Sequence, residues 1–262
     1  MPNRCRGCRP SQPETLALGF RRMRRVAELP PPPDHFDATG QVTDWDMLGN
    51  DQFGNCVFAE EANYKKAVTR GTGNPEILVT RETCIKDYLI YTGGHDNGAN
   101  IDDALNYFRR VGLMDDEHVH HHIGPHGALN AHDLNELRHG VALFRGVKIA
   151  VAADLLERHV GTESGWFIDR KGFGQIDHCV GLYAYGTVAY CLRLCGVNPR
   201  VADAYRHAPA FVLYTWGTIG VITWTALRSI IGEAWVRITD PDRADSPVWD
   251  PIAATDYAAV VQ

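Results

Sequence analysis

The best candidate for nucleophilic chemistry in this sequence is a cysteine that follows a polar, glycine-containing turn. Residues 51–56 read DQFGNC, and an apolar, helix-favouring run begins at Cys56. A thiol in the first turn of a helix lies near unpaired backbone N–H groups and the positive end of the helix dipole, which lower its pKa. Gln52 precedes it by four residues and could donate to an oxyanion. The pattern predicts an acyl-transfer nucleophile, while a small, buried, inert thiol fits the same six residues.

Two later stretches contain further chemistry-bearing residues. His178 leads a strand-like segment rich in small residues, DHCVGLYAYG at residues 177–186. The following strand-like segment, FVLYTWGT at residues 211–218, ends in Trp-Gly-Thr. A strand histidine by itself is more often a packing residue than a catalytic one. His178 is a candidate catalytic residue because its segment lies between the Cys56 segment and the Trp-Gly-Thr segment along the chain.

Taken in order, the three stretches resemble the papain-like cysteine peptidases. In that family a glutamine precedes the cysteine that begins the long central helix, a histidine opens a strand in the second half, and the next strand ends in Asn-Ser-Trp-Gly-Thr. The resemblance covers residues 45–238, and residues 48–56 look like a divergent group carried in phage and prophage genomes. It implies an α+β papain-like fold, in which a helical first half packs its nucleophile helix against a mainly antiparallel β-sheet or barrel.

The resemblance also implies a role for each matched residue. Cys56 would be the nucleophile, and His178 would be its base and later its acid. Gln52 and the backbone N–H of Cys56 would form the oxyanion hole, and Trp216 would shield the pair from water. A thiol and an imidazole can do this chemistry only within hydrogen-bond reach of each other.

The sequence departs from the family pattern at three positions. The gap between the glutamine and the cysteine is four residues rather than six, and Val57 follows the nucleophile where the family has tryptophan. Tyr214 stands where the family has the asparagine that holds the histidine ring. Since a third polar residue should hold the ring tautomer, Thr215 or Asp177 is left as the residue that orients the histidine.

The elements that must position these residues follow from periodicity and from glycine and proline breakers. Period-3.6 patterns predict helices in the first half, and period-2 patterns predict strands in the second. The expected helices are residues 56–70, 80–91, 102–111, 133–143 and a short one within 224–231; the expected strands are 146–152, 176–185, 210–216 and 233–239.

Charge and proline content divide the chain into three parts. Residues 1–34 form a basic arm with seven arginines, ended by a run of four prolines. Residues 35–239 are the expected papain-like domain, with a helical half at 35–143 and a β half at 144–239. Residues 240–262 are a tail rich in Asp, Pro and Ala that we expect to wrap the surface. Residues 1–9 are expected to be a solvated, poorly ordered tail, and both ends are candidates for docking to other subunits.

Composition narrows the class of protein. The 262 residues are 45% hydrophobic and 22% charged, with a net charge of −6, as in an ordinary globular protein. No apolar run approaches the ~20 residues of a membrane span, and no secretory h-region is seen, so a cytoplasmic or virion-associated protein is expected. Seven scattered cysteines indicate reduced thiols rather than a disulfide framework. The acidic body argues against a nucleic-acid partner.

No metal or cofactor is expected, although two motifs leave a metal site open. The C-x-x-C pair Cys5 and Cys8 lacks a second pair at suitable spacing for zinc. Seven of the twelve histidines lie between His118 and His139, without a carboxylate or cysteine partner at a recognisable spacing. We interpret the run at residues 118–122 as a polar loop.

Two functions remain from the sequence. The first is a cysteine hydrolase that cleaves an amide or peptide bond of a peptide or protein substrate through a thioester on Cys56. The second is a papain-like scaffold, with weak or no catalysis, that serves as a structural or interaction protein of a phage particle or other assembly. The arginine-rich arm, the proline run and the changed asparagine position favour the second.

Overall fold

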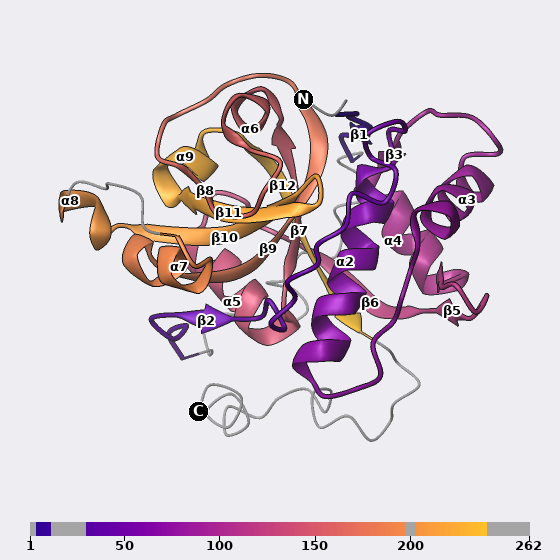
Figure 1. The fold of residues 1–262 in the computed structure, drawn as a ribbon, viewed down its shortest axis with the longest axis horizontal. Helices are drawn as coiled ribbons and strands as arrows, with labels where there is room; N and C mark the ends of the chain where they lie inside the picture. Colours follow the sequence, from indigo (N-terminus) through magenta and orange to yellow (C-terminus); the bar gives the residue numbers. More distant parts are fainter. Residues whose placement is uncertain (1–3, 12–29, 198–202, 240–262) are drawn as a thin grey trace.

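Helices precede most of the strands along the chain. The computed structural model describes residues 4–11, 30–197 and 203–239. Figure 1 shows α2 (Cys56–Gly71), α3 (Arg81–Tyr91) and α4 (Ile101–Arg110) gathered on one side of the molecule, with most strands of the large sheet on the other. The predicted α+β class, with a helical first half, is therefore confirmed.

One eight-stranded sheet forms most of the second half. Its neighbours are antiparallel, apart from the parallel pair β11 and β8. This confirms the mainly antiparallel second half. The strand order is β6 (Ile123–Leu129), β12 (Ile231–Thr239), β7 (Val147–Ala152), β9 (Ile176–Thr187), β10 (Pro209–Thr215), β11 (Thr218–Thr223) and β8 (Trp166–Ile168), and β2 (Phe36–Asp37) also pairs with β9.

Most predicted elements lie within a few residues of the observed ones. The polar loop expected at 118–122 is wrong in part, because it contains β5 (His120–His121), and the sheet strand β6 that follows it was not predicted. Glycine, proline and histidine interrupt the alternation of apolar and polar residues in β6, so its sequence does not show the pattern that predicts a strand. The remaining elements are β1 (Cys8–Arg9), β3 (Ala99–Asn100), β4 (Leu113–Met114), α5 (Leu134–Phe144), α6 (Asp154–His159), α7 (Val188–Leu194), α8 (Asp203–Arg206) and α9 (Trp224–Arg228).

Helix α2 is buried on every side for most of its length. Its residues from Cys56 to Val68 are all buried, charged ones included. Phe58 packs against α3 and α4, with ring centroids 5.7 Å from Tyr88 and 4.8 Å from Phe108. The opposite side of the helix faces β9 of the sheet. A helix so enclosed holds its first residue in a fixed place.

Four charged side chains join α2 to the sheet. Glu60 and Glu61 of α2 meet Lys148 of β7 and Arg237 of β12 at N–O distances of 2.9 to 3.0 Å. All four side chains are completely buried. The Arg237 guanidinium also lies 3.4 Å from the ring centroid of Tyr64. This buried ion quartet, with balanced charge, fixes α2 against two strands.

The prediction of a solvated tail at residues 1–9 is wrong for its described part. β1 pairs in parallel with β3, and the Cys5 N–H donates to the Asn50 carbonyl at 2.9 Å. Counting charges along the chain makes arginines look solvated, but here they meet carboxylates of the domain. The rest of the arm before Pro30 and the tail at 240–262 lie outside the described residues. In the described part of the chain, no helix is long and apolar enough to cross a membrane.

Candidate active site

A compact turn delivers Cys56 to the first position of α2. Leu48 and Gly49 adopt left-handed backbone conformations, with φ of 50° and 88°. Asn55 precedes the helix but does not cap it with its side chain. Its amide donates instead to the Leu48 carbonyl at 2.8 Å, and the Gly54 N–H donates to Asp96 at 2.9 Å. The turn is therefore closed by side-chain hydrogen bonds that fix where the helix begins.

Two neighbouring strands position His178. It is the third residue of β9, and Thr215 is the last residue of the adjacent β10. The ring Nε2 and the Thr215 Oγ1 are 2.8 Å apart. Trp216, at φ 46° in the turn after β10, stacks on the imidazole with centroids 4.3 Å apart and planes 17° apart. Of the two candidates for orienting the ring, the structure places Thr215 against it, while Asp177 contacts Arg6.

The two halves of the fold bring the cysteine to the histidine strand. The Cys179 N–H, one residue after His178, donates to the Cys56 sulfur at 3.4 Å. With Nε2 at Thr215, the other ring nitrogen, Nδ1, has no hydrogen-bond partner in the described part of the chain. Nδ1 is therefore the ring nitrogen that is not engaged by another residue.

Burial keeps both groups neutral in this structure. It raises the pKa of Cys56 to about 11, although N–H donors of Cys179, Gly7 and Val57 act in the opposite direction. It lowers the pKa of His178 to about 3, with a further contribution from the charges of Arg6 and Arg4. The expectation that the helix terminus lowers the thiol pKa is therefore wrong here, because desolvation outweighs it.

The predicted oxyanion donor lies on the turn before Cys56. The Gln52 side chain is exposed, and its backbone N–H donates to the Gly49 carbonyl at 2.9 Å. None of the described hydrogen bonds uses its side-chain amide, so the role of Gln52 stays a prediction.

The described part of the arm, residues 4–11, covers the cysteine. A Cβ on Gly7 would collide with the Gly54 carbonyl, and one on Gly98 would collide with the Gly7 carbonyl. The Gly7 carbonyl accepts from the Ala99 N–H at 2.7 Å, and the Gly7 backbone is close enough to Cys56 to act on the pKa of its thiol. The arm thus passes through a slot that only glycine can occupy, and it leaves Cys56 2% exposed.

Two arginines anchor the arm beside the histidine. Arg4 donates to the carbonyls of Val160 and Gly161 at 2.7 and 3.0 Å and lies over the Trp216 ring. Arg6 enters a cluster of three carboxylates that we call the acidic trio. The acidic trio consists of Asp154, Glu157 and Asp177, with closest distances to Arg6 of 2.7, 2.6 and 2.8 Å. The sequence analysis named Asp177 only as a candidate to orient His178 and missed the other residues of this cluster, since only the excess of arginine before residue 35 hinted at it.

The histidines between 118 and 139 have separate partners. His121 and Asp115 are 2.7 Å apart, and His126 and Asp102 are 3.1 Å apart. The His139 ring lies 2.9 Å from the Pro30 carbonyl. Among the described residues, no three His, Cys, Asp or Glu side chains are placed to hold a metal ion.

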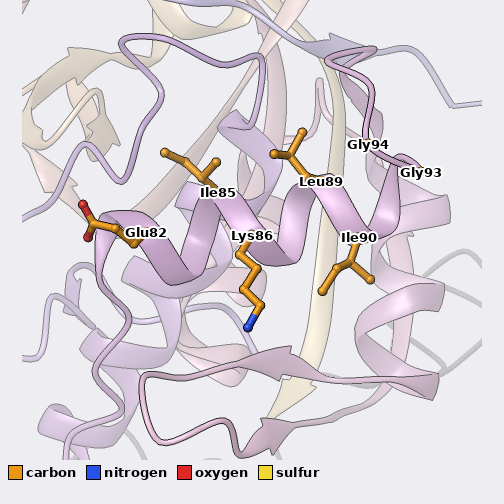
Figure 2. A pocket seen from close by; sticks show the side chains of 7 residues that line it. All are labelled: Glu82, Ile85, Lys86, Leu89, Ile90, Gly93 and Gly94. Atoms are coloured by element: carbon orange, nitrogen blue, oxygen red, sulfur yellow. The ribbon is translucent and has the colours of Figure 1, made fainter.

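A large hollow on α3 is separate from the site. It measures about 650 Å³ and is lined by one face of α3 and the turn that follows it, including Ile85, Leu89 and Gly93. Figure 2 shows the side chains of Ile85 and Leu89 projecting from α3, with Gly93 on the turn that follows it. The hollow includes none of the predicted catalytic residues.

Replacement of Thr215 by valine tests the ring contact. We expect Thr215→Val to slow acylation of Cys56 by an activated peptide ester about 10- to 100-fold, because valine cannot bond Nε2 and the ring loses its orientation. Thr187→Val is the control, since Thr187 caps α7 at the far end of β9. It should lower stability by about 1 kcal/mol and leave acylation unchanged. Equal rates in the two variants would contradict this role.

Comparison with known proteins identifies the fold. No family model matches the sequence, and no curated protein matches it. Among solved structures, xylellain, a cysteine protease from Xylella fastidiosa, is similar with TM-score 0.62 and 14% identity over 92% of this chain and 98% of that one. Procathepsin L 3 of the Tenebrio molitor larval midgut has TM-score 0.59 and 14% identity, over 90% and 76%. The proform of the ragweed pollen allergen Amb a 11 has TM-score 0.58 and 15% identity, over 82% and 69%. The chain therefore has a papain-like fold, as predicted.

Proposed function

We propose that this chain is a cysteine hydrolase that cleaves amide bonds of peptide or protein substrates through a thioester on Cys56. The observation that carries the proposal is the contact of the Cys56 sulfur with the backbone N–H of Cys179, the residue after His178. This contact joins the thiol to the strand that carries His178, and the Nε2 of His178 is 2.8 Å from Thr215 Oγ1. The likeness of the fold to cysteine proteases supports the same reaction class.

Each residue has a defined part in the proposed reaction. Nδ1 of His178 takes the thiol proton, and the thiolate attacks the carbonyl carbon. The oxyanion accepts hydrogen bonds from the Cys56 N–H and the Gln52 amide. His178 then protonates the leaving amine as the C–N bond breaks. A water molecule, deprotonated by His178, hydrolyses the thioester and restores the thiol.

The described conformation is a latent form in this proposal. Gly7 packs against Gly54 in the turn before Cys56, and the sulfur-bearing residue is 2% exposed, so a substrate carbonyl carbon has no access to the thiol. A thiol with a pKa of about 11 and an imidazole with a pKa of about 3 do not form the charged pair at neutral pH. The arm must leave before catalysis, since its departure admits both substrate and water.

Cleavage of a defined peptide library, followed by mass spectrometry, tests the function. In the full chain with Gly7→Ala, the arm cannot occupy its slot, and we expect this variant to cleave peptides. Adding Cys56→Ala to the same variant should lower the cleavage rate at least about 10³-fold. Cys195→Ala is the control, because this half-buried cysteine lies outside the site. Cleavage that survives Cys56→Ala would contradict the mechanism. No cleavage by any variant would favour the papain-like scaffold of an assembly such as a phage particle.

A further inference from the structure

The acidic trio lies at the cleft rather than elsewhere on the surface. Asp177 immediately precedes His178 on β9, and Asp154 and Glu157 lie on α6. Arg6, which fills the trio, immediately precedes Gly7, which packs against Gly54 in the turn before Cys56. A chain that reaches the sulfur through this slot therefore places a neighbouring side chain among three carboxylates.

The trio matches the donor geometry of a guanidinium. Arg6 Nε donates to Glu157 at 2.9 Å, Nη1 to Asp177 at 2.8 Å and Nη2 to Asp154 at 2.7 Å. Three differently directed nitrogens thus meet three different carboxylates, which is the fork geometry that distinguishes arginine. The second oxygen of Asp177 accepts from the Ala153 N–H at 3.2 Å, so this wall of the pocket is held by the backbone.

Two further observations indicate that the cleft takes a ligand in place of the arm. The Nδ1 atom of His178 is buried and without a hydrogen-bond partner in the described part of the chain. A hollow of about 230 Å³ remains beside the arm, lined by Arg6 and Gly7 together with Gly54, Gly98 and Asp177. When the arm leaves, three like charges face the emptied pocket, and a cation is the group that complements them.

We propose that Asp154, Glu157 and Asp177 form a subsite that accepts an arginine or lysine side chain of the peptide substrate, in the place that Arg6 occupies in the covered chain. This proposal depends on the proposed function in one respect only: it assumes that peptides bind at the site of Cys56 and His178. It names the substrate class as peptides with a basic residue next to the reacting bond.

Binding to an inactive chain tests the subsite without any turnover. The protein is the full chain with Cys56→Ala, Arg4→Ala and Arg6→Ala, which releases the arm, empties the pocket and removes the nucleophile. The probes are fluorescein-labelled Ala-Ala-Arg-Gly-Ala-Ala amide and the same peptide with citrulline, which keeps the shape of arginine but lacks its charge. We expect fluorescence anisotropy to give a Kd at least about tenfold lower for the arginine peptide.

Additional substitutions locate the preference. Glu157→Gln or Asp154→Asn should reduce the difference between the two peptides to less than about threefold, whereas Glu163→Gln, in the exposed loop after α6, should leave it unchanged. Thermal melts followed by circular dichroism show whether each variant is folded. Equal binding of the two peptides, binding of neither, or a preference that survives both neutral variants would overturn the proposal. Because Cys56 is absent throughout, these outcomes are independent of whether the chain hydrolyses amides.

Discussion

Replacing Arg4 and Arg6 together by alanine is expected to raise the rate at which iodoacetamide alkylates Cys56 at pH 7 by about 100-fold. With a pKa of about 11, only about one thiol in ten thousand is ionised at pH 7 in the covered chain. The thiolate is the reacting species, and burial is the main cause of the raised pKa. Release of the arm restores water to the sulfur and moves its pKa back towards the ordinary value of about 8.5.

The pH dependence gives a second signature of the same release. The native chain should show alkylation that rises with pH up to about 11, because each unit of pH increases the thiolate fraction until the pKa is passed. In the double variant the rise should end at a lower pH. The His178 pKa should also rise from about 3, since water returns to the ring and two positive charges leave it.

Matched variants separate release of the arm from a general loss of charge. Arg110→Ala with Arg228→Ala removes two exposed arginines outside the cleft and should leave alkylation of Cys56 unchanged. Gly7→Ala keeps both anchors but collides with the Gly54 carbonyl, so it should also raise the rate. Peptide mapping of the labelled protein shows which cysteine reacts. A double variant as slow as the native chain would show that the arm does not control access to the sulfur.

Replacing Lys148 by methionine is expected to destabilise the protein by about 3–5 kcal/mol. Lys148 lies between Glu60 and Glu61 with no exposed surface, at 2.9 and 3.0 Å. Its removal leaves an uncompensated negative charge in the interior, which costs far more than loss of an exposed ion pair. For a domain of this size, the change corresponds to a fall in Tm of about 10 °C, measured by thermal melting.

Restoring the charge balance tests whether the cause is electrostatic. The double variant Lys148→Met with Glu61→Gln removes one charge of each sign, so we expect it to recover at least about 1 kcal/mol relative to the sum of the two single changes. Arg81→Met is the control, because its pair with Asp51 is partly exposed and should contribute less than about 1 kcal/mol. If Lys148→Met cost no more than this control, the quartet would not fix α2 to the sheet.

Local patterns were sufficient for the separate parts of the site. The breaker-rich turn at 48–55 and the run that follows it predict a helix that starts at Cys56, and the structure begins α2 at that residue. Alternation predicts a strand from Ile176, and β9 begins there with His178 in its third position. Turns, helix starts and strand periodicity depend on residues a few positions apart, so they can be predicted from a single sequence.

The ring contact and the ion quartet depended on distant parts of the chain. Thr215 and Asp177 were equal candidates for orienting His178, and only the pairing of β9 with β10 brings Thr215 to the ring. Glu60 and Glu61 occur in a run that reads as an ordinary helix, and Lys148 is one charge within an apolar strand. The ion pairs of Lys148 with Glu60 and Glu61 join positions about 90 residues apart, and no local sequence pattern predicts such a contact.

The sequence by itself determined which residues could react and which elements carry them. The tertiary structure alone decided the state of those residues. The start of a helix predicts a lowered thiol pKa, but the arm buries Cys56 and raises its pKa to about 11. Composition makes the arginines of the arm look solvated, yet Arg6 lies among the acidic trio. The physical reason is common to both: desolvation and charge pairing depend on what surrounds a group in space, and here those surroundings come from a segment 50 to 170 residues away.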